Sequence, residues 1–312
     1  MKVQEIFNLS TKMGIKADLR GDKRVIEKQK KIKKRYEKMS AEEKADFDKQ
    51  KLSNPYLDSG VHFDNKKQVK KIMCGIDIDT SELMMAKELG EIDLVIAHHP
   101  LGKALADLPE VMPLQVEVLA GYGVPINIAE GCFKMRIQEV ARGVNPANHY
   151  KTVDAAKLLN INLMNVHTPC DNLVADFLKK KLSRKRFEYV GEIMEFLKSI
   201  PEYAEAEKKG AGPKLFAGDK NNFCGKIALT EITGGTSGAK EVYEKMANAG
   251  IGTIIGMHMS EENKKEAEKN HLNVIIAGHM SSDSLGVNLF LDELEKKGIK
   301  IVPCSGLIRV RR

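Results

Sequence analysis

The sequence predicts an α/β fold, with layers of helices covering largely parallel or mixed sheets. Short apolar runs alternate with segments of helical periodicity between residues 69 and 303, and this alternation is typical of layered α/β proteins. The alternation breaks at 183–225, where several Pro and Gly residues interrupt the pattern. We therefore expect two α/β lobes joined by an irregular connection, preceded by a basic N-terminal helical hairpin.

Composition limits the class of protein. The chain has 312 residues and is 42% hydrophobic, which is enough for two lobes with cores of their own. No apolar run approaches the roughly 20 residues that span a bilayer, and the polar N-terminus does not resemble a secretory signal. The five cysteines are dispersed without a C-x-x-C pair, which favours reduced thiols in a cytoplasmic protein without membrane contact.

The N-terminal segment, residues 1–65, holds most of the positive charge. Residues 20–51 contain 13 Lys/Arg and 7 Asp/Glu, a net charge of +6 (13 − 7) out of +7 for the whole chain. Ser40 and Glu43 have capping-box spacing, so they predict the start of a second helix. Four apolar residues share one face of the first helix: Val25, Ile32, Tyr36 and Met39. We favour a solvated hairpin, with nucleic acid as a less favoured partner of this segment.

The first lobe is expected over residues 66–182. Its predicted strands are Val69–Ile78, Ile92–Ala97, Val124–Ala129 and Asn162–Val166. Its predicted helices are Ser81–Leu89, Val111–Ala120, Asn127–Asn145, Thr152–Leu159 and Asn172–Lys181. Apolar strands separated by helices in this way indicate parallel pairing.

The second lobe is expected over residues 226–312. Its predicted strands are Lys226–Ile232, Thr253–Ile255, Asn273–Ala277 and Ile299–Pro303, and its predicted helices are Ala239–Ala249, Glu261–Lys269 and Leu285–Lys297. The Gly-rich turn Thr233–Gly238 could hold a phosphate at a helix N-terminus. Because it lacks the P-loop pattern, we favour a structural turn.

Polar clusters follow three of these strands. The clusters are His98-His99-Pro100, His167 with Asp171, and His279 with Asp283. Ligands bind at the carboxyl ends of strands in open α/β sheets, so the three clusters can converge on one site. A lone His is more often a hydrogen-bonding residue than a ligand, but the repetition favours a metal. Imidazole and carboxylate without paired Cys favour a hydrolytic or non-haem metal over structural zinc.

These motifs resemble the Nif-three-like dinuclear metal-centre proteins, some of which are labelled GTP cyclohydrolase type 2 homologues. The segments GIDIDTSELMMAKELGEIDLVIAHHP, VHTPCDN and AGHMSSD carry the resemblance, which spans residues 66–312. The resemblance implies a Nif-three-like fold and a toroidal homohexamer. It also implies two divalent metal ions, with zinc, iron and manganese as the candidates.

The resemblance assigns site residues by position. His98 and His99 match the paired histidine ligands, Asp171 matches the bridging carboxylate, and His279 matches the C-terminal histidine ligand. Asp283 stands where the family usually has Glu. Because Asp is one methylene shorter, either the loop comes closer or the second metal is bound less tightly. The segment NPYLDSGVHF resembles a degenerate form of an early family element, and the basic hairpin resembles an insertion.

Two functions remain open. One is a metal-dependent hydrolase acting on a nucleotide-like or phosphorylated small molecule, in which two metals acidify water and hold the reacting oxygens. The other is a non-catalytic metal-handling or regulatory binding protein. His167 is expected either as a general base or hydrogen-bond donor behind the ligands, or merely as a cap of its turn. Three further residues are candidates for the pocket wall: Glu130, His258 and Glu261.

Overall fold

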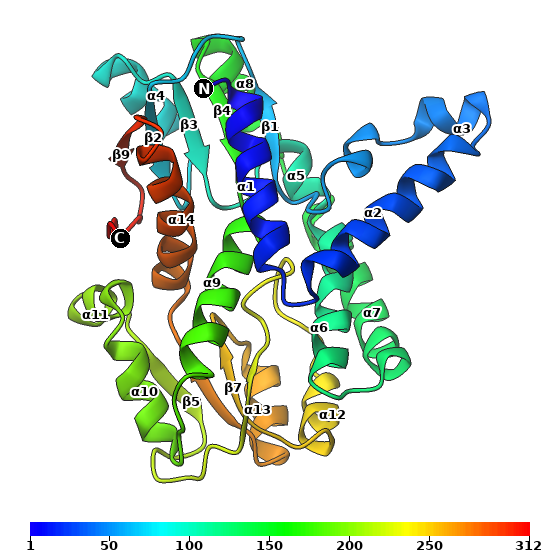
Figure 1. Cartoon of the computed structure of the whole chain (residues 1–312), viewed down its shortest axis with the longest axis vertical. Helices are drawn as coiled ribbons and strands as arrows, with labels where there is room; N and C mark the ends of the chain where they lie inside the picture. The colour runs from blue at the N-terminus through cyan, green and yellow to red at the C-terminus, as the bar shows by residue number, and fades with distance from the viewer.

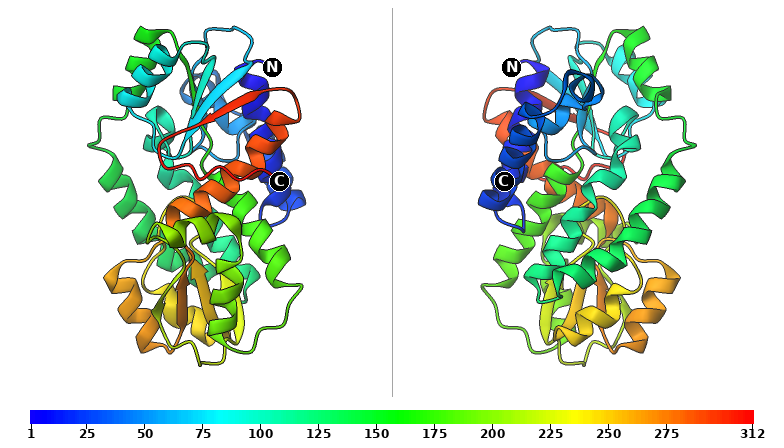
Figure 2. Two further views of the ribbon diagram at one scale, coloured as in Figure 1. Left: turned by 90° about the vertical axis from the view of Figure 1, so that its left-hand side faces the viewer. Right: turned by 90° about the vertical axis from the view of Figure 1, so that its right-hand side faces the viewer.

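The computed structural model describes residues 1–312 and contains two sheets, one above the other along the long axis (Figures 1 and 2). The five-stranded sheet has the order β1-β4-β3-β2-β9, and the four-stranded sheet has the order β5-β8-β7-β6. Each sheet is parallel except for one antiparallel edge strand, β1 in the first and β5 in the second. The predicted layered α/β fold is confirmed.

The first sheet is buried on both faces. Its strands are β1 (Gly60–Phe63), β2 (Lys71–Gly75), β3 (Leu94–Ala97), β4 (Asn162–Asn165) and β9 (Lys300–Pro303). Helices α4 (Thr80–Leu89) and α8 (Lys151–Leu159) cover one face, and α1 (Val3–Ala17), α9 (Thr168–Leu182) and α14 (His279–Glu295) cover the other. Side chains alternate between the two cores, because successive residues of a strand point to opposite faces. Met73 belongs to the α4 side, and Ile72 and Cys74 belong to the α14 side.

The second sheet has the same three-layer arrangement. Its strands are β5 (Lys214–Ala217), β6 (Lys226–Leu229), β7 (Ile251–Gly256) and β8 (Asn273–Ile276). One face packs on α9, α10 (Val190–Lys198) and α11 (Pro201–Lys208). The other packs on α6 (Pro113–Gly121), α7 (Ile126–Val144), α12 (Val242–Asn248) and α13 (Glu261–Lys269). Ile254 faces the α7 side and Ile255 faces the α10 side.

The two lobes exchange segments of chain. The last strand, β9, pairs in parallel with β2 of the first sheet, although the sequence places residues 226–312 in the second lobe. Helices α6 and α7 come from the predicted first lobe but pack on the second sheet. The reason is that pairing and packing depend on which apolar faces match, and chain order does not reveal this. Residues of the first and second lobes are therefore interleaved in sequence.

Two local predictions are corrected. The apolar run Val124–Ala129 is not a strand, because Pro125 caps helix α7, which buries Ala129 and Phe133 against the second sheet. The connection 183–225 is not irregular, because it contains α10, α11 and β5. Pro201 occupies the first turn of α11, where proline is tolerated. Helix α1 was not anticipated; it packs against α9 and lies over the first sheet.

The predicted hairpin forms. It consists of α2 (Asp22–Glu37) and α3 (Ala41–Asp46), and the capping box of Ser40 and Glu43 is present with both hydrogen bonds. The short elements η1 (Lys49–Leu52), α5 (Gly102–Ala106) and η2 (Leu108–Val111) complete the chain. All five cysteines are free. None of the helices combines the length and the apolarity that a bilayer span requires.

Candidate metal centre

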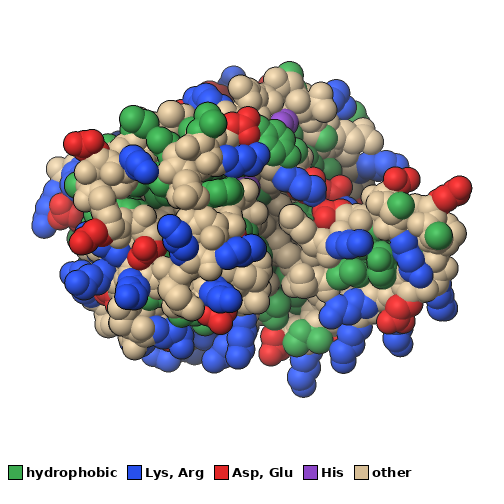
Figure 3. Space-filling model, turned by 90° about the horizontal axis from the view of Figure 1, so that it is seen from above, with side chains coloured by type: hydrophobic (Ala, Val, Ile, Leu, Met, Phe, Trp, Pro, Cys, Tyr) green, Lys and Arg blue, Asp and Glu red, His purple; other side chains and the backbone are tan.

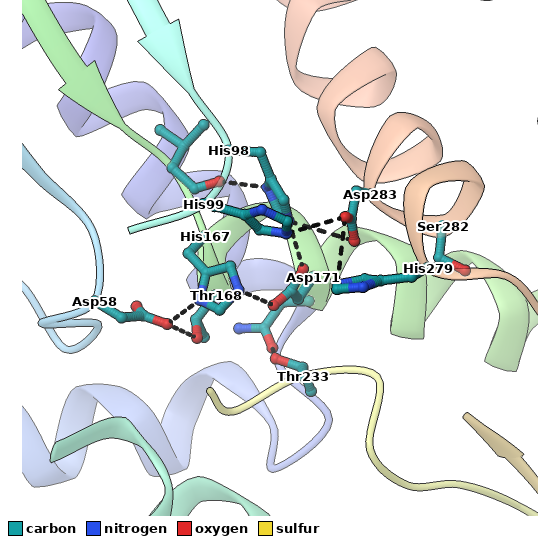
Figure 4. A network of polar contacts seen from close by, with 12 residues as sticks. Asp58, His98, His99, His167, Thr168, Asp171, Thr233, His279, Ser282 and Asp283 are labelled. Atoms are coloured by element: carbon teal, nitrogen blue, oxygen red, sulfur yellow. Dashed lines mark hydrogen bonds and ion pairs between the residues drawn. The ribbon is translucent and has the colours of Figure 1, made fainter. Parts of the chain in front are cut away.

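The three predicted clusters meet at one point between the first sheet and helices α9 and α14 (Figure 4). His98 and His99 follow β3, Asp171 lies in the first turn of α9, and His279 and Asp283 lie in the first turns of α14. His279 and Asp283 are four residues apart, so the helix places them on the same face. The carboxyl end of a strand and two helix starts therefore supply the site.

His98 is the most buried imidazole of the site. Its Nδ1–H donates to the carbonyl oxygen of Val166 at 2.9 Å, because a carbonyl only accepts. Its Nε2 then faces two carboxylates, 3.3 Å from Asp171 Oδ1 and 3.5 Å from Asp283 Oδ1. In the neutral imidazole this nitrogen carries a lone pair and is itself an acceptor. It therefore faces two carboxylate oxygens that cannot donate to it, unless a proton or a metal cation lies between them.

His99 and His167 are held in the same way. The Nδ1–H of His99 donates to Asp77 Oδ1 at 2.6 Å, and that of His167 donates to Asp58 Oδ2 at 2.7 Å. A carboxylate or carbonyl behind Nδ1 is the usual means of presenting Nε2 to a metal. The Nε2 of His99 lies 3.3 Å from Asp283 Oδ2, and the Nε2 of His167 lies 3.8 Å from Asp171 Oδ2.

Asp283 reaches the other residues despite its short side chain. It is fully buried, and its Oδ2 lies 3.3 Å from His99 Nε2 and 3.5 Å from His279 Nε2. Neither of its oxygens has a hydrogen-bond donor, and the same is true of Asp171 Oδ1 and His98 Nε2. Buried polar atoms without partners are costly, so each requires an explanation. A cation shared by these atoms would satisfy all of them, so the residues fit a metal.

Two groups of three side chains have donor atoms within 4.8 Å of one another. The groups are His98, His167 and Asp171, and His98, His99 and Asp283. His279 lies beside the second group, with its ring 5.2 Å from that of His99. His167 thus contributes a donor atom to the cluster, beyond the role of a turn cap.

The charges at the site depend strongly on one another. Burial alone lowers the pKa of His98, but the charge of Asp283 and the close carboxylate oxygens of Asp171 and Asp283 raise it well above its usual value. Burial alone raises the pKa of Asp283, but the charge of His98 and the close ring nitrogens of His98 and His99 bring it far below the usual range. The carboxylates thus hold positive charge at this point, and a metal cation would replace the protons.

Sequence reasoning missed Asp58 and Asp77. Asp58 also accepts from Thr168 Oγ1 at 2.6 Å, and it lies in the NPYLDSGVHF segment, which was noted without a role. Asp77 follows β2 in the motif GIDID, twenty-two residues before His99. The available signals were the family-like segment that contains Asp58 and the place of Asp77 at the end of a predicted strand. Which histidine each carboxylate meets depends on the pairing of β1 with β4 and of β2 with β3.

A small pocket of about 20 Å³, enough for about one water molecule, adjoins the cluster. The second lobe forms most of its wall through the turn after β6 and the residues after β7. The lining residues are His167, Asp171, Glu231, Ile232, Thr233, Gly235, Thr236, Met257, His258 and His279. His258 therefore lines the pocket, as expected. Burial is the larger cause and the charge of His279 the smaller cause that lower the pKa of His258 to about 4. Glu130 and Glu261 do not line this pocket.

The turn Thr233–Gly238 forms part of this wall, and side chains from elsewhere in the fold hold it in place. The side-chain amide of Gln115 donates to the carbonyl oxygens of Gly234 at 2.8 Å and Thr236 at 2.6 Å. Ser237 Oγ lies 2.7 Å from His258 Nδ1. Gly234 and Gly235 have φ of 90° and 98°, a conformation that favours glycine. The turn is thus held by side chains of the fold, as the structural interpretation expects.

Comparisons with known proteins find one matching family model and several similar solved structures. The family model described as Duf34/NIF3 (NGG1p interacting factor 3) matches residues 139–305, more than half of the chain. A NIF3 superfamily protein from Sphaerobacter thermophilus is 30% identical with a TM-score of 0.73, covering 80% of this chain and 92% of that chain. Reduced HcgD from Methanocaldococcus jannaschii is 20% identical, with a TM-score of 0.48 and coverage of 78% and 88%. Protein ybgI is 17% identical, with a TM-score of 0.49 and coverage of 90% and 97%. No curated protein sequence matches the chain.

Proposed function

Because the chain belongs to the Duf34/NIF3 family, we propose that it binds divalent metal ions through His98, His99, Asp171, His279 and Asp283. One observation carries this proposal. Three histidines donate from Nδ1 to fixed acceptors, so their Nε2 lone pairs converge on the buried carboxylates of Asp171 and Asp283, three of whose four oxygens have no hydrogen-bond donor. His167 is a further candidate for the ligand set.

We propose two ions. The two overlapping groups share His98, whose single free nitrogen serves one ion only, and the carboxylates of Asp171 and Asp283 supply four oxygens. Asp171 lies between His98 and His167, which suits the bridging role that the resemblance implies. Nitrogen and oxygen donors without thiolate suit zinc, iron or manganese.

The preferred function is a metal-dependent hydrolase acting on a nucleotide-like or phosphorylated small molecule. Bound divalent cations supply Lewis-acid chemistry, which polarises a phosphoryl oxygen and acidifies water. Asp58 and Asp77 fix the imidazoles of His167 and His99, and the pocket beside His258 has room for about one water molecule. His167, hydrogen-bonded to Asp58, is the proposed proton acceptor if it is not a ligand.

The alternative is a non-catalytic metal-handling or regulatory binding protein. The observation that favours it is the pocket wall, which contains no Lys or Arg to neutralise a phosphate. The acidic side chain of Glu231 in that wall accepts a hydrogen bond from Tyr243 at 2.7 Å, so its acceptor oxygen is already in use. A small ligand without phosphate would suit such a wall better.

Assembly and location are also proposals. We expect a homohexamer from family resemblance, and α4 and α8 offer exposed apolar side chains that contacts between subunits would cover: Met84, Met85, Leu89 and Leu158. Free thiols at all five cysteines favour the cytoplasm.

Metal analysis of the purified protein tests the central proposal. We expect close to two equivalents per chain, and the loss of at least one in His99→Ala. Lys87→Gln, at an exposed position of α4 away from the site, is the matched control and retains both. Absence of metal from the wild type after reconstitution with zinc, iron or manganese would refute it. A hydrolysis screen with phosphomonoesters, phosphodiesters and nucleotides then separates the two functions, because full occupancy without turnover favours the binding protein.

A further inference from the structure

The hairpin of α2 and α3 projects from the body and carries uncompensated positive charge (Figures 1 and 3). Within Lys30–Lys38 there are six basic residues and one acidic residue, a net charge of +5 (6 − 1). All six basic side chains are exposed and none forms an ion pair: Lys30, Lys31, Lys33, Lys34, Arg35 and Lys38. This stretch of helix therefore presents free cations to solvent.

Basic residues on the body side of the hairpin differ, because they are paired. Arg24 Nε lies 2.8 Å from Glu117 Oε2, and Lys28 pairs with the same carboxylate. Lys51 Nζ lies 2.8 Å from Glu110 Oε2. These three basic side chains thus have carboxylate partners, whereas the six of the outer part of α2 have none.

The hairpin is held in a defined position. Val25 is buried at the base of α2. At the tip, the ring centroids of Tyr36 and Phe47 are 5.0 Å apart, and Lys44 Nζ donates to the carbonyl oxygen of Glu37 at 3.2 Å. A preformed helix binds a partner without the entropic cost of folding.

The spacing of the free lysines suits a phosphate backbone. Lys30, Lys34 and Lys38 lie on one helix face, about 6 Å apart along the axis, with Lys31 beside them. The row is about 12 Å long. One strand of B-DNA carries a phosphate about every 3.4 Å of axis, so the row spans three or four phosphates. Ile32 lies on the opposite face of the helix, and Met39 follows the end of the helix. Both side chains are half-buried, so they are not available to contact bases.

We propose that the outer face of α2 binds the phosphate backbone of a nucleic acid without reading its bases. Contacts of this kind position a protein on a nucleic acid but carry no sequence information. The concentration of six exposed, unpaired cations within Lys30–Lys38 is what favours a partner over a merely solvated helix. A regular row of single positive charges fits a regular row of phosphates better than the irregular carboxylates of an acidic protein.

The test is salt-dependent binding to labelled duplex DNA and duplex RNA of random sequence, measured by fluorescence anisotropy on the full chain. Neutralising the four lysines of the row, Lys30→Gln, Lys31→Gln, Lys34→Gln and Lys38→Gln, is expected to reduce the slope of log K against log salt by about 3 to 4 on DNA. Wild-type affinity should fall about 100-fold between 50 and 200 mM salt. The control replaces four exposed, unpaired lysines elsewhere by Gln: Lys87, Lys265, Lys297 and Lys300.

The DNA and RNA arms decide which nucleic acid is the better ligand. Binding of either, lost in the row variant and retained in the control, supports the proposal. Failure of the wild type to bind both at 50 mM salt overturns it, and so does an equal slope in the row variant and the wild type. Circular dichroism of both variants verifies that α2 remains folded, and His99→Ala should bind nucleic acid normally because the metal site is separate.

Discussion

Glu231 should make the protein less stable as the pH rises toward neutrality. This side chain is buried, burial raises its pKa to about 7, and the hydrogen bond from Tyr243 offsets only part of that rise. An unfolded Glu has a pKa near 4.3 to 4.5. Between these values the native state holds a proton that the unfolded state has released, so stability falls with rising pH. The contribution is complete below about pH 4.5 and is lost as the pH passes about 7.

The magnitude follows from the difference of about 2.5 between the two pKa values. Each unit corresponds to 1.36 kcal/mol, so the full contribution is about 3 kcal/mol, of which about 2.5 kcal/mol is lost between pH 5 and pH 8. Glu231→Gln keeps an acceptor for Tyr243 and removes the titration. The difference in free energy of unfolding between wild type and Glu231→Gln should therefore fall by about 2.5 kcal/mol over this range.

Urea unfolding at pH 5, 6, 7 and 8, in the presence of a chelator, measures this difference. The chelator removes the pH dependence that metal binding itself contributes. Glu241→Gln, an exposed residue of the same region, is the matched control and should show no comparable trend. A difference that stays constant with pH would show that Glu231 remains ionised in the folded protein, and the reasoning from burial would be wrong.

Two further changes test the site and the packing around it. Asp58→Asn should weaken metal affinity about 10- to 100-fold while leaving the fold intact, because the amide no longer fixes the ring of His167 as a carboxylate does. Chelator competition measures this affinity, and an unchanged value would show that Asp58 does not support the metal site. Gly286→Ala should destabilise by about 1–3 kcal/mol, because its Cβ would lie 2.3 Å from the carbonyl oxygen of Cys170, where α14 crosses α9. Gly131→Ala, in open space on α7, is its control and should not destabilise in thermal unfolding.

Local patterns predicted most elements because they are set by neighbours in sequence. The spacing of Ser40 and Glu43 predicted a helix start, and both capping hydrogen bonds are present. Helix α13 begins and ends where its pattern predicts. The pattern failed at Val124–Ala129, where a short apolar run is compatible with either a strand or the start of a helix. Burial of Phe133 against the second sheet decided in favour of the helix.

The sequence by itself determined the α/β class, the clusters after three strands, and the family, whose resemblance is confirmed by the match over residues 139–305. Tertiary structure decided which side chains meet. Asp58 and His167 are 109 residues apart, and β9 joins the first sheet after the whole second lobe has intervened. Such contacts depend on which strand pairs with which, and no local spacing encodes that choice. The unpaired lysines of α2 are a further example, because only the folded chain shows which lysines form an ion pair with a carboxylate.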